Sequence, residues 1–302
     1  MQAIYEDQAQ ASLTASPLCP ICFGAHSLGW GFRTVHAMFE CQSCGVVFFD
    51  RARFELHDYQ TYYEYTDDWD DARVKWEMKI RRRALTKQLA RIGTYVNGRT
   101  LLDVGAGPGY LCRIACDNGW DARGIEVSAK ARRIGKQFLR VEYVDIARVE
   151  DESLDVITCH HVLEHMTRPD EFIRELRTKL KPSGVVVIHV PHREPLSFLI
   201  RNTLNGFKAA QTERLCALYI PEHVLGFTQA SLTHAFSLFG FQPLFVRTSA
   251  MWSVYYDPFF LKNYLRENDY LGILQHTLRC LIDNVGVLVG RGDWVIGHFR
   301  KA

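Results

Sequence analysis

The chain has 302 residues, 47% of them hydrophobic, and a formal net charge of +2. This length is sufficient for one large domain and one small domain with buried cores. The charges nearly balance, whereas a dedicated nucleic-acid binder usually carries a strong excess of positive charge. The N-terminus lacks the basic start and apolar core of a signal peptide. No run approaches the roughly 18 apolar residues of a membrane-spanning helix, so we expect a cytoplasmic protein without a membrane partner.

Four of the nine cysteines form two Cys-x-x-Cys pairs, separated by 18 residues near the start of the chain. Each pair suits a turn that directs two thiolates to one ion, and this spacing is typical of zinc sites. Disulfides are the alternative, but the odd number of cysteines and a reducing compartment argue against them. We therefore predict a structural Zn²⁺ in a module that resembles a zinc ribbon. Its predicted ligands are Cys19, Cys22, Cys41 and Cys44.

A linker at residues 57–97 is expected to join this module, at residues 1–56, to a larger domain at residues 98–302. The linker begins with a polar stretch rich in tyrosine, whose rings either line a pocket or pack on the larger domain. A helix without Gly or Pro is predicted from Asp70 to Ile92. Its many Lys and Arg residues form either a solvated face or a nucleic-acid surface.

Residues 100–110 predict a buried strand, a tight turn and the start of a helix. Gly105, Gly107 and Gly109 stand at alternate positions of the turn, where a backbone without Cβ atoms can approach a ligand closely. The pattern Gly-x-Gly-x-Gly differs from the dinucleotide fingerprint, and no Gly-Lys-Ser/Thr of a P-loop follows. The carboxylate of Asp103 disfavours a pyrophosphate and favours a ligand with a positive amino group.

Between residues 100 and 190 the predicted strands and helices alternate, which is typical of a parallel sheet with helices on both faces. Ligands of such folds lie at the carboxyl ends of the strands. Glu126 ends the second predicted strand, where a carboxylate suits two ribose hydroxyls. We expect strands at 100–105, 121–126, 141–144, 154–159 and 184–190, and helices at 109–119, 128–139 and 168–181.

Five segments in this order resemble motifs of the class I S-adenosylmethionine-dependent methyltransferases. They are Asp103-Val-Gly-Ala-Gly-Pro-Gly, Glu126, Asp145, Ser153-Leu-Asp-Val-Ile-Thr-Cys-His-His-Val-Leu-Glu-His-Met and Leu180-Lys-Pro-Ser-Gly-Val-Val-Val-Ile. The resemblance implies an α/β Rossmann-like fold with a seven-stranded sheet, and S-adenosyl-L-methionine as the cofactor. It implies that Asp103 and the glycines order the methionine end, that Glu126 holds the ribose, and that Asp145 reads the adenine amine. The other implied cofactor residues are Tyr110, Ile146 and His160.

The last third of the chain is predicted to contain a helix at 229–239 and strands at 241–248 and 294–300. In the family these two strands form an antiparallel pair at the sheet edge. Two insertions, at about 192–220 and 249–288, interrupt this region, and the second is rich in Trp, Tyr, Phe and Leu. We expect the insertions to form either a covered substrate pocket or a surface for a homodimer.

Methyl transfer to a hydroxyl or an acidic C–H requires removal of a proton, and a histidine with a pKa near the operating pH suits this task. His165 lies in a segment that recurs in family members with many different substrates, so we expect it to have a structural role. The Glu222-His223 pair stands out because a carboxylate beside an imidazole can tune its orientation and basicity. The predicted base is therefore His223 with Glu222, and the other candidates are His192 and His161.

The Glu222-His223 pair also resembles a segment of zinc-containing sugar C-methyltransferases, which share a four-cysteine module and this cofactor fold. Those chains are longer, and Tyr219 lies one residue farther from the pair than in their pattern. Shorter zinc-ribbon methyltransferases that end in a strand like Gly290-Arg-Gly-Asp-Trp are a nearer likeness. We therefore expect methylation of a small molecule, such as a sugar, nucleotide sugar or specialised metabolite, at oxygen or carbon. The alternatives are a zinc-ribbon RNA methyltransferase and a non-catalytic member that binds the cofactor or a partner.

Overall fold

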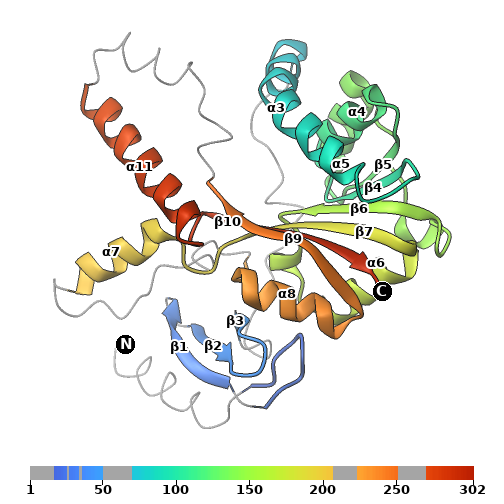
Figure 1. Cartoon of the computed structure of the whole chain (residues 1–302). Helices are drawn as coiled ribbons and strands as arrows, with labels where there is room; N and C mark the ends of the chain where they lie inside the picture. Colours follow the sequence, from blue (N-terminus) through green and yellow to red (C-terminus); the bar gives the residue numbers. More distant parts are fainter. Residues whose placement is uncertain (1–16, 26, 34–35, 50–69, 207–222, 251–269) are drawn as a thin grey trace.

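The computed structural model describes residues 17–25, 27–33, 36–49, 70–206, 223–250 and 270–302. Two sheets organise this part of the chain (Figure 1). The large sheet has six strands in the order β5-β4-β6-β7-β10-β9, and the small sheet has four in the order β1-β2-β3-β8. The large sheet and its helices make up the predicted α/β fold.

The large sheet combines a parallel part with an antiparallel edge, as the sequence predicts. Four strands are parallel: β4 (Thr100–Val104), β5 (Asp121–Ile125), β6 (Leu154–His160) and β7 (Leu180–Pro191). The antiparallel edge consists of β10 (Trp294–Lys301), which pairs with β7, and β9 (Phe241–Ser249), which pairs with β10. The predicted strands agree with these bounds within a few residues, and β7 begins earlier than expected because the chain enters it directly from a helix.

The prediction of a strand at 141–144 is wrong. Only Tyr143 pairs there, through a single parallel bridge to Gly124. The segment instead braces the glycine loop, because the hydroxyl of Tyr143 donates a hydrogen bond to the carbonyl of Gly107 at 2.8 Å. The chain then turns into a short 3-10 helix at Ile146–Arg148. Six strands thus form the described sheet, and this bridge stands where the predicted seventh strand would lie.

Helices cover both faces of the large sheet (Figure 1). One face carries α3 (Asp71–Ile92), α4 (Tyr110–Asp117) and α5 (Ala129–Ile134), and the other carries α6 (Pro169–Lys179) and α8 (Gln229–Leu238). Val186 and Ile188 of β7 join the core with α6 and α8, whereas Val187 joins the core under α3 and α4. This alternation follows from the period of two along a strand. Each of these helices confirms a predicted one.

The four-cysteine module forms most of the small sheet. Its strands are β1 (Ser27–Arg33), β2 (His36–Cys41) and β3 (Val47–Phe49), and the fourth, β8 (Leu225–Gly226), comes from the other half of the chain. Phe48 belongs to the same hydrophobic cluster as Phe236 of α8. A strand pair and a shared core therefore join the module to the large sheet. The predicted domain boundary at residue 56 lies outside the described residues.

Each predicted insertion contributes a helix. α7 (Leu196–Gly206) lies in the first and α11 (Tyr270–Leu288) in the second, and the two helices contact each other. Both extend beyond the end of the large sheet (Figure 1). Within the described ranges, no helix combines the length and apolar character needed to cross a bilayer.

Candidate functional site

The three predicted glycines form the loop between β4 and α4, at the carboxyl end of the parallel strands. Gly105, Gly107 and Gly109 have φ angles of 74°, 54° and 84°. A Cβ atom on Gly105 would lie 2.3 Å from Cγ2 of Val162, and one on Gly109 would lie 2.6 Å from Cγ2 of Val141. Conformation and space therefore both require glycine at these two positions. Gly109 is the N-cap of α4, so the first N–H groups of this helix remain available to a polar ligand.

Glu126 follows β5 and reaches back to the glycine loop. Its Oε2 accepts a hydrogen bond from the N–H of Gly107 at 2.7 Å, and its Oε1 accepts one from the N–H of Ser128 at 2.8 Å. These bonds hold two acceptor oxygens beside the loop, the arrangement that a ribose diol requires. Asp145 lies two residues after Tyr143, which forms the single bridge to β5. Its side chain caps a turn by accepting a hydrogen bond from the N–H of Ala147 at 3.0 Å. Ile146 directly follows it.

Asp103 lies inside the end of β4 and is 5% exposed. The hydroxyl of Thr158 donates a hydrogen bond to its Oδ1 at 2.7 Å. Burial is the main cause that raises the pKa of this carboxyl group to about 7; the Thr158 bond opposes the rise and the charge of Glu126 adds to it. A cation bound nearby would favour the ionised form. Asp103 therefore has the properties expected of a group that responds to a positive ligand.

His160 ends β6 and belongs to a group of imidazoles in which His160 and His189 are half-buried and His298 is buried. Its ring stacks on that of His189 with 3.9 Å between centroids, and its Nε2 lies 2.9 Å from Nε2 of Gln88 on α3. Burial lowers the pKa of His160 to about 3 and that of His298 to about 4, and it holds the pKa of His189 well below the ordinary value. At neutral pH these rings are uncharged, so His160 is suited to hydrogen bonding and not to proton transfer. Gln88 also brings α3 to this end of the sheet.

A buried carboxylate, Glu164, lies among three histidines just beyond β6. Its Oε1 is 3.3 Å from Nδ1 of His161, and 4.0 Å from Nε2 of both His165 and His223. Its Oε2 has no hydrogen-bond partner within the described part of the chain. Burial raises the pKa of Glu164, but the His161 hydrogen bond and the charges of the three histidines outweigh this effect and hold the pKa below its ordinary value. The group is therefore an ionised carboxylate enclosed by imidazoles.

The cluster contains His223 of the predicted Glu222-His223 pair and supplies a second carboxylate, Glu164, beside it; the pairing with Glu222 stays a prediction. Glu222 lies outside the described residues, whereas the N–H of Val224 donates to the carbonyl of Glu164 at 2.8 Å and so places His223 beside it. His165, for which we expected a structural role, has its ring 4.8 Å from that of His223. Sequence reasoning missed Glu164, although an acid between two closely spaced histidines is a detectable signal. The donor atoms of Glu164, His165 and His223 lie within 4.8 Å of one another, so this set could also hold a metal ion.

His161 is the accessible member of the cluster. Its side chain is 39% exposed, and its ring meets that of Trp294 edge-on at 5.0 Å. Its backbone has a φ of 57° and donates a hydrogen bond to the carbonyl of His189 at 2.9 Å. A residue other than glycine rarely adopts this left-handed conformation, which costs about 1–2 kcal/mol. The surrounding structure therefore fixes an unusual placement of the His161 ring.

His192 is close to this region, but its ring presents an N–H donor and not a free acceptor nitrogen. Its Nδ1 accepts a hydrogen bond from the N–H of Glu194 at 3.1 Å, which leaves the proton of a neutral ring on Nε2. Burial, with smaller effects from the charges of Arg291 and Arg193, lowers the pKa of His192 to about 4. The nitrogen that would accept a proton is already engaged, and this weighs against His192 as a base.

The four predicted zinc ligands come together at two turns. The Sγ atoms of Cys19 and Cys44 are 3.5 Å apart, those of Cys22 and Cys41 are 3.4 Å apart, and all four lie within 4.8 Å of one another. A tetrahedral Zn²⁺ with Zn–S bonds of about 2.3 Å places its sulfurs about 3.8 Å apart. The four thiols therefore fit one zinc ion, with no coordination position left for a substrate.

A family model described as methyltransferase domain matches residues 78–245, more than half of the chain. Among curated proteins, the chain is similar to the ubiquinone biosynthesis O-methyltransferase of Bordetella avium (strain 197N), with 32% identity over 114 residues that cover 34% of this chain and 47% of that protein. It is also similar to the mitochondrial ubiquinone biosynthesis O-methyltransferase of Schizosaccharomyces pombe, with 30% identity over 150 residues that cover 45% of this chain and 54% of that protein. The chain spans about half the length of these curated relatives.

Among solved structures, the fold is similar to phosphoethanolamine N-methyltransferase 2 of Haemonchus contortus in complex with phosphomonomethylethanolamine and S-adenosylhomocysteine. The TM-score is 0.50 at 16% identity, over 82% of this chain and 61% of that chain. This likeness concerns the fold alone. Together with the family model, it confirms the α/β Rossmann-like methyltransferase fold that the motifs predict.

Proposed function

Because the chain belongs to the methyltransferase-domain family, we propose that it transfers a methyl group from S-adenosyl-L-methionine to an oxygen of a small molecule. The observation that carries the proposal is the convergence of the glycine loop, Glu126 and the Glu164 cluster at the carboxyl ends of β4, β5 and β6. The loop and Glu126 suit a nucleoside cofactor, and the cluster suits proton removal. The names of the curated relatives favour oxygen as the methylated atom.

In this proposal the cofactor supplies an activated methyl group on sulfur, and the chain binds and aligns it. The two oxygens of Glu126 would accept from the ribose hydroxyls, and Asp145, with Ile146 beside it, would bind the adenine amine. The glycine loop and Asp103 would hold the methionine end. A neighbouring ammonium group would offset the effect of burial on the pKa of Asp103 and would favour the ionised carboxylate. The remaining cofactor residues are Tyr110 and His160.

We infer that His161 is the base, and that Glu164 takes the role expected of Glu222. The Nδ1–H of His161 donates to Glu164 Oε1, which leaves Nε2 to accept the proton of a substrate hydroxyl. His161 is also far more accessible than His223, whose side chain is 7% exposed and whose Nε2 lies 4.0 Å from the same carboxylate. Both observations favour His161 over our sequence-based choice of His223.

The test is release of S-adenosylhomocysteine during incubation with S-adenosylmethionine and a panel of sugars, nucleotide sugars and phenols. With an accepted substrate, His161→Ala should lower kcat by about 100-fold or more, whereas its Kd for S-adenosylhomocysteine should stay within about twofold of wild type. His234→Ala, on the exposed side of α8, serves as the control. Unchanged turnover of His161→Ala, with slow turnover of His223→Ala, would return the role to His223.

We further infer that the four cysteines hold a structural Zn²⁺. The Sγ atoms of all four cysteines lie within 4.8 Å of one another, close enough to bind one ion. The two cysteine turns and the β1-β2-β3 strands support the likeness to a zinc ribbon. Elemental analysis should find about one Zn²⁺ per chain, and a chain without zinc would contradict the inference.

The basic helix α3 does not by itself favour RNA as the substrate. Several of its cations are paired with acids: Lys75 with Asp71, Arg81 with Glu77 at 2.6 Å, and Arg82 with Asp117 at 3.0 Å. Such pairs describe a solvated face of a helix better than a phosphate-binding surface. A small-molecule acceptor therefore remains our proposal, with sugars and specialised metabolites first in the screen.

We also infer a homodimer, because α11 carries an exposed apolar stripe at heptad spacing. Its alternating steps of three and four residues are those of the seam of a two-helix coiled coil. The flanking positions Gln275, Thr277, Ile282 and Asn284 carry no charge, so a second copy meets no like-charge repulsion there. Light scattering should detect a dimer that Leu274→Glu with Leu281→Glu converts to a monomer, and a monomeric wild type would contradict it. The stripe consists of Leu271, Leu274, Leu278, Leu281, Val285 and Leu288, which are 40–85% exposed.

A further inference from the structure

The cysteine module contacts both chain segments that flank the Glu164 cluster. On one side, Phe48 of β3 pairs with Leu225 of β8, and the N–H of Phe49 donates to the carbonyl of Val224 at 3.3 Å. The N–H of Val224 in turn donates to the carbonyl of Glu164 at 2.8 Å. A continuous series of backbone hydrogen bonds thus runs from the module to the main chain of Glu164, the residue that carries the buried carboxylate.

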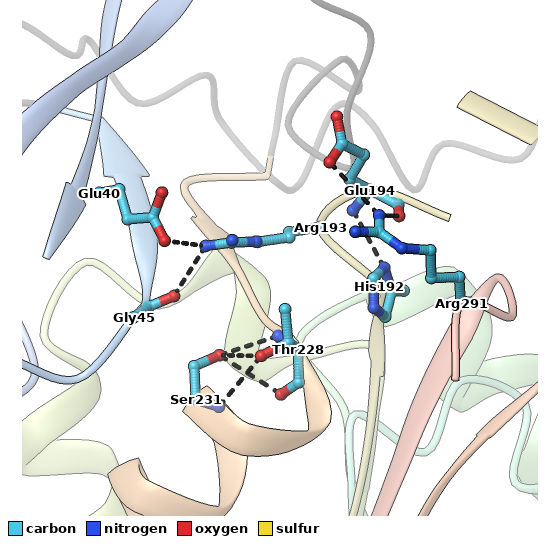
Figure 2. A network of polar contacts seen from close by, with 8 residues as sticks. All are labelled: Glu40, Gly45, His192, Arg193, Glu194, Thr228, Ser231 and Arg291. Atoms are coloured by element: carbon cyan, nitrogen blue, oxygen red, sulfur yellow. Dashed lines mark hydrogen bonds and ion pairs between the residues drawn. The ribbon is translucent and has the colours of Figure 1, made fainter. Parts of the chain in front are cut away.

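On the other side, Arg193 reaches the module from the segment after β7 (Figure 2). Its Nη1 donates to the carbonyl of Gly45 at 3.0 Å and to Oε1 of Glu40 at 2.6 Å. Gly45 directly follows the ligand Cys44, and its φ of 70° sets the direction of this carbonyl. The backbone N–H of Arg193 donates to the carbonyl of Phe227, just beyond β8, at 2.7 Å. One residue therefore links the cysteine turn to both segments.

The segment that carries Arg193 also places the aromatic neighbour of the base. The N–H of His192 donates to the carbonyl of Asp293 at 2.7 Å. Asp293 precedes Trp294, whose ring meets that of His161. Displacement of Arg193 would therefore shift His192 and Trp294, and through Trp294 it would change the packing of the His161 ring.

We propose that Arg193 is a positioning residue that couples the metal-loaded cysteine module to the acceptor side of the site. The four thiolates, once bound to metal, fix the turn in which the N–H of Gly45 donates to the carbonyl of Cys41 at 2.8 Å. The Gly45 carbonyl then holds the Arg193 guanidinium by a charge-assisted bond. The glycine loop has separate supports in Glu126 and Tyr143, so the cofactor side should respond little. This inference rests on the proposed function only in naming the acceptor side.

The test is hydrogen exchange on the zinc-loaded full chain, which requires no knowledge of the acceptor. In Arg193→Met, amides of residues 192–194 and 223–227 should exchange about tenfold faster than in wild type, and those of residues 100–110 should be unchanged. Arg193→Lys should restore part of the protection because its ammonium group can still donate to Gly45. Glu40→Gln, which keeps an acceptor oxygen, should have a smaller effect in the same segments. Arg133→Met, on the exposed side of α5, is the control.

Removal of zinc from wild type with EDTA should reproduce the pattern of Arg193→Met, and removal from the variant should add no further change at residues 192–194. Exchange in Arg193→Met equal to that in Arg133→Met would overturn the coupling, and so would loosening that extends to residues 100–110. A separate titration of wild type with S-adenosylhomocysteine measures cofactor binding. Absence of binding there would end the proposed function, while the exchange data would still decide whether Arg193 couples the module to the cluster.

Discussion

Replacement of Asp103 by asparagine is expected to change how the stability of the protein depends on pH. Burial is the main cause that raises the pKa of this carboxyl group from 3.8 to about 7. Between these values the folded protein binds a proton that the unfolded chain has lost, so the free energy of unfolding decreases as the pH rises. At about 1.4 kcal/mol per pH unit, this group should cost about 4 kcal/mol of stability above pH 7.

Urea denaturation of wild type and Asp103→Asn at pH 5 and pH 8 measures this effect. Asparagine keeps an oxygen that can accept from Thr158 but cannot ionise, so other titrating groups largely cancel in the comparison. The free energy of unfolding of the variant relative to wild type should increase by about 3 kcal/mol from pH 5 to pH 8. Asp121→Asn, at the exposed start of β5, is the surface control. A difference that does not change with pH would refute the reasoning, since Asp103 would then be ionised throughout.

Three further predictions concern the glycine loop, the buried carboxylate and the metal. Gly105→Ala should destabilise the fold by about 2–4 kcal/mol, because a positive φ and a Cβ close to Val162 both oppose alanine. Gly107→Ala is opposed only by its positive φ and should cost about 1–2 kcal/mol. Equal losses of stability in the two variants would exclude a clash at Gly105. Glu164→Gln should cost about 1.5–3 kcal/mol at pH 7, because it weakens the hydrogen bond between the ring of His161 and a charged acceptor. The deficit should shrink as the pH falls below the ordinary carboxyl pKa, because a group with a lowered pKa stabilises the fold only while ionised; a constant deficit from pH 7 to pH 3.5 would contradict this. Chelation of zinc should lower the thermal midpoint, and Cys41→Ser should bind zinc more weakly; an unchanged midpoint in EDTA would argue against a structural metal.

The arrangement of the glycine loop and Glu126, which form our proposed cofactor side, could be predicted from the sequence because its signals are local. The buried strand β4, the alternating glycines and the acid Glu126 after β5 each leave a short pattern, and the alternation of elements places their ends at one edge of the sheet. The cysteine cluster follows in the same way from two short pairs. The strand expected at 141–144 is reduced to one bridge between Tyr143 and Gly124, and the hydrogen bond from Tyr143 to the glycine loop is a tertiary contact that strand propensity does not encode.

The acceptor side could not be predicted because it depends on contacts between distant segments. Adjacency in the sequence suggested Glu222 as the partner of His223, and Glu222 lies outside the described residues. The fold brings a further carboxylate, Glu164, to His223 through a backbone bond from Val224, and adjacency does not reveal this contact. The short strand β8, which pairs with the cysteine module, has no local signature. The role of Arg193 likewise depends on a carbonyl in a turn that lies far from it in the chain.

Calorimetric titration of the zinc-loaded protein with S-adenosylmethionine and S-adenosylhomocysteine tests the proposed cofactor site most directly. We expect binding in the micromolar range, about −8 kcal/mol, that Glu126→Ala weakens at least tenfold because it removes both oxygens beside the glycine loop. Glu150→Ala, an exposed acid outside the site, should bind as wild type does. Absence of binding to the folded protein, or equal affinity of Glu126→Ala and wild type, would contradict the assignment of this loop as the cofactor site.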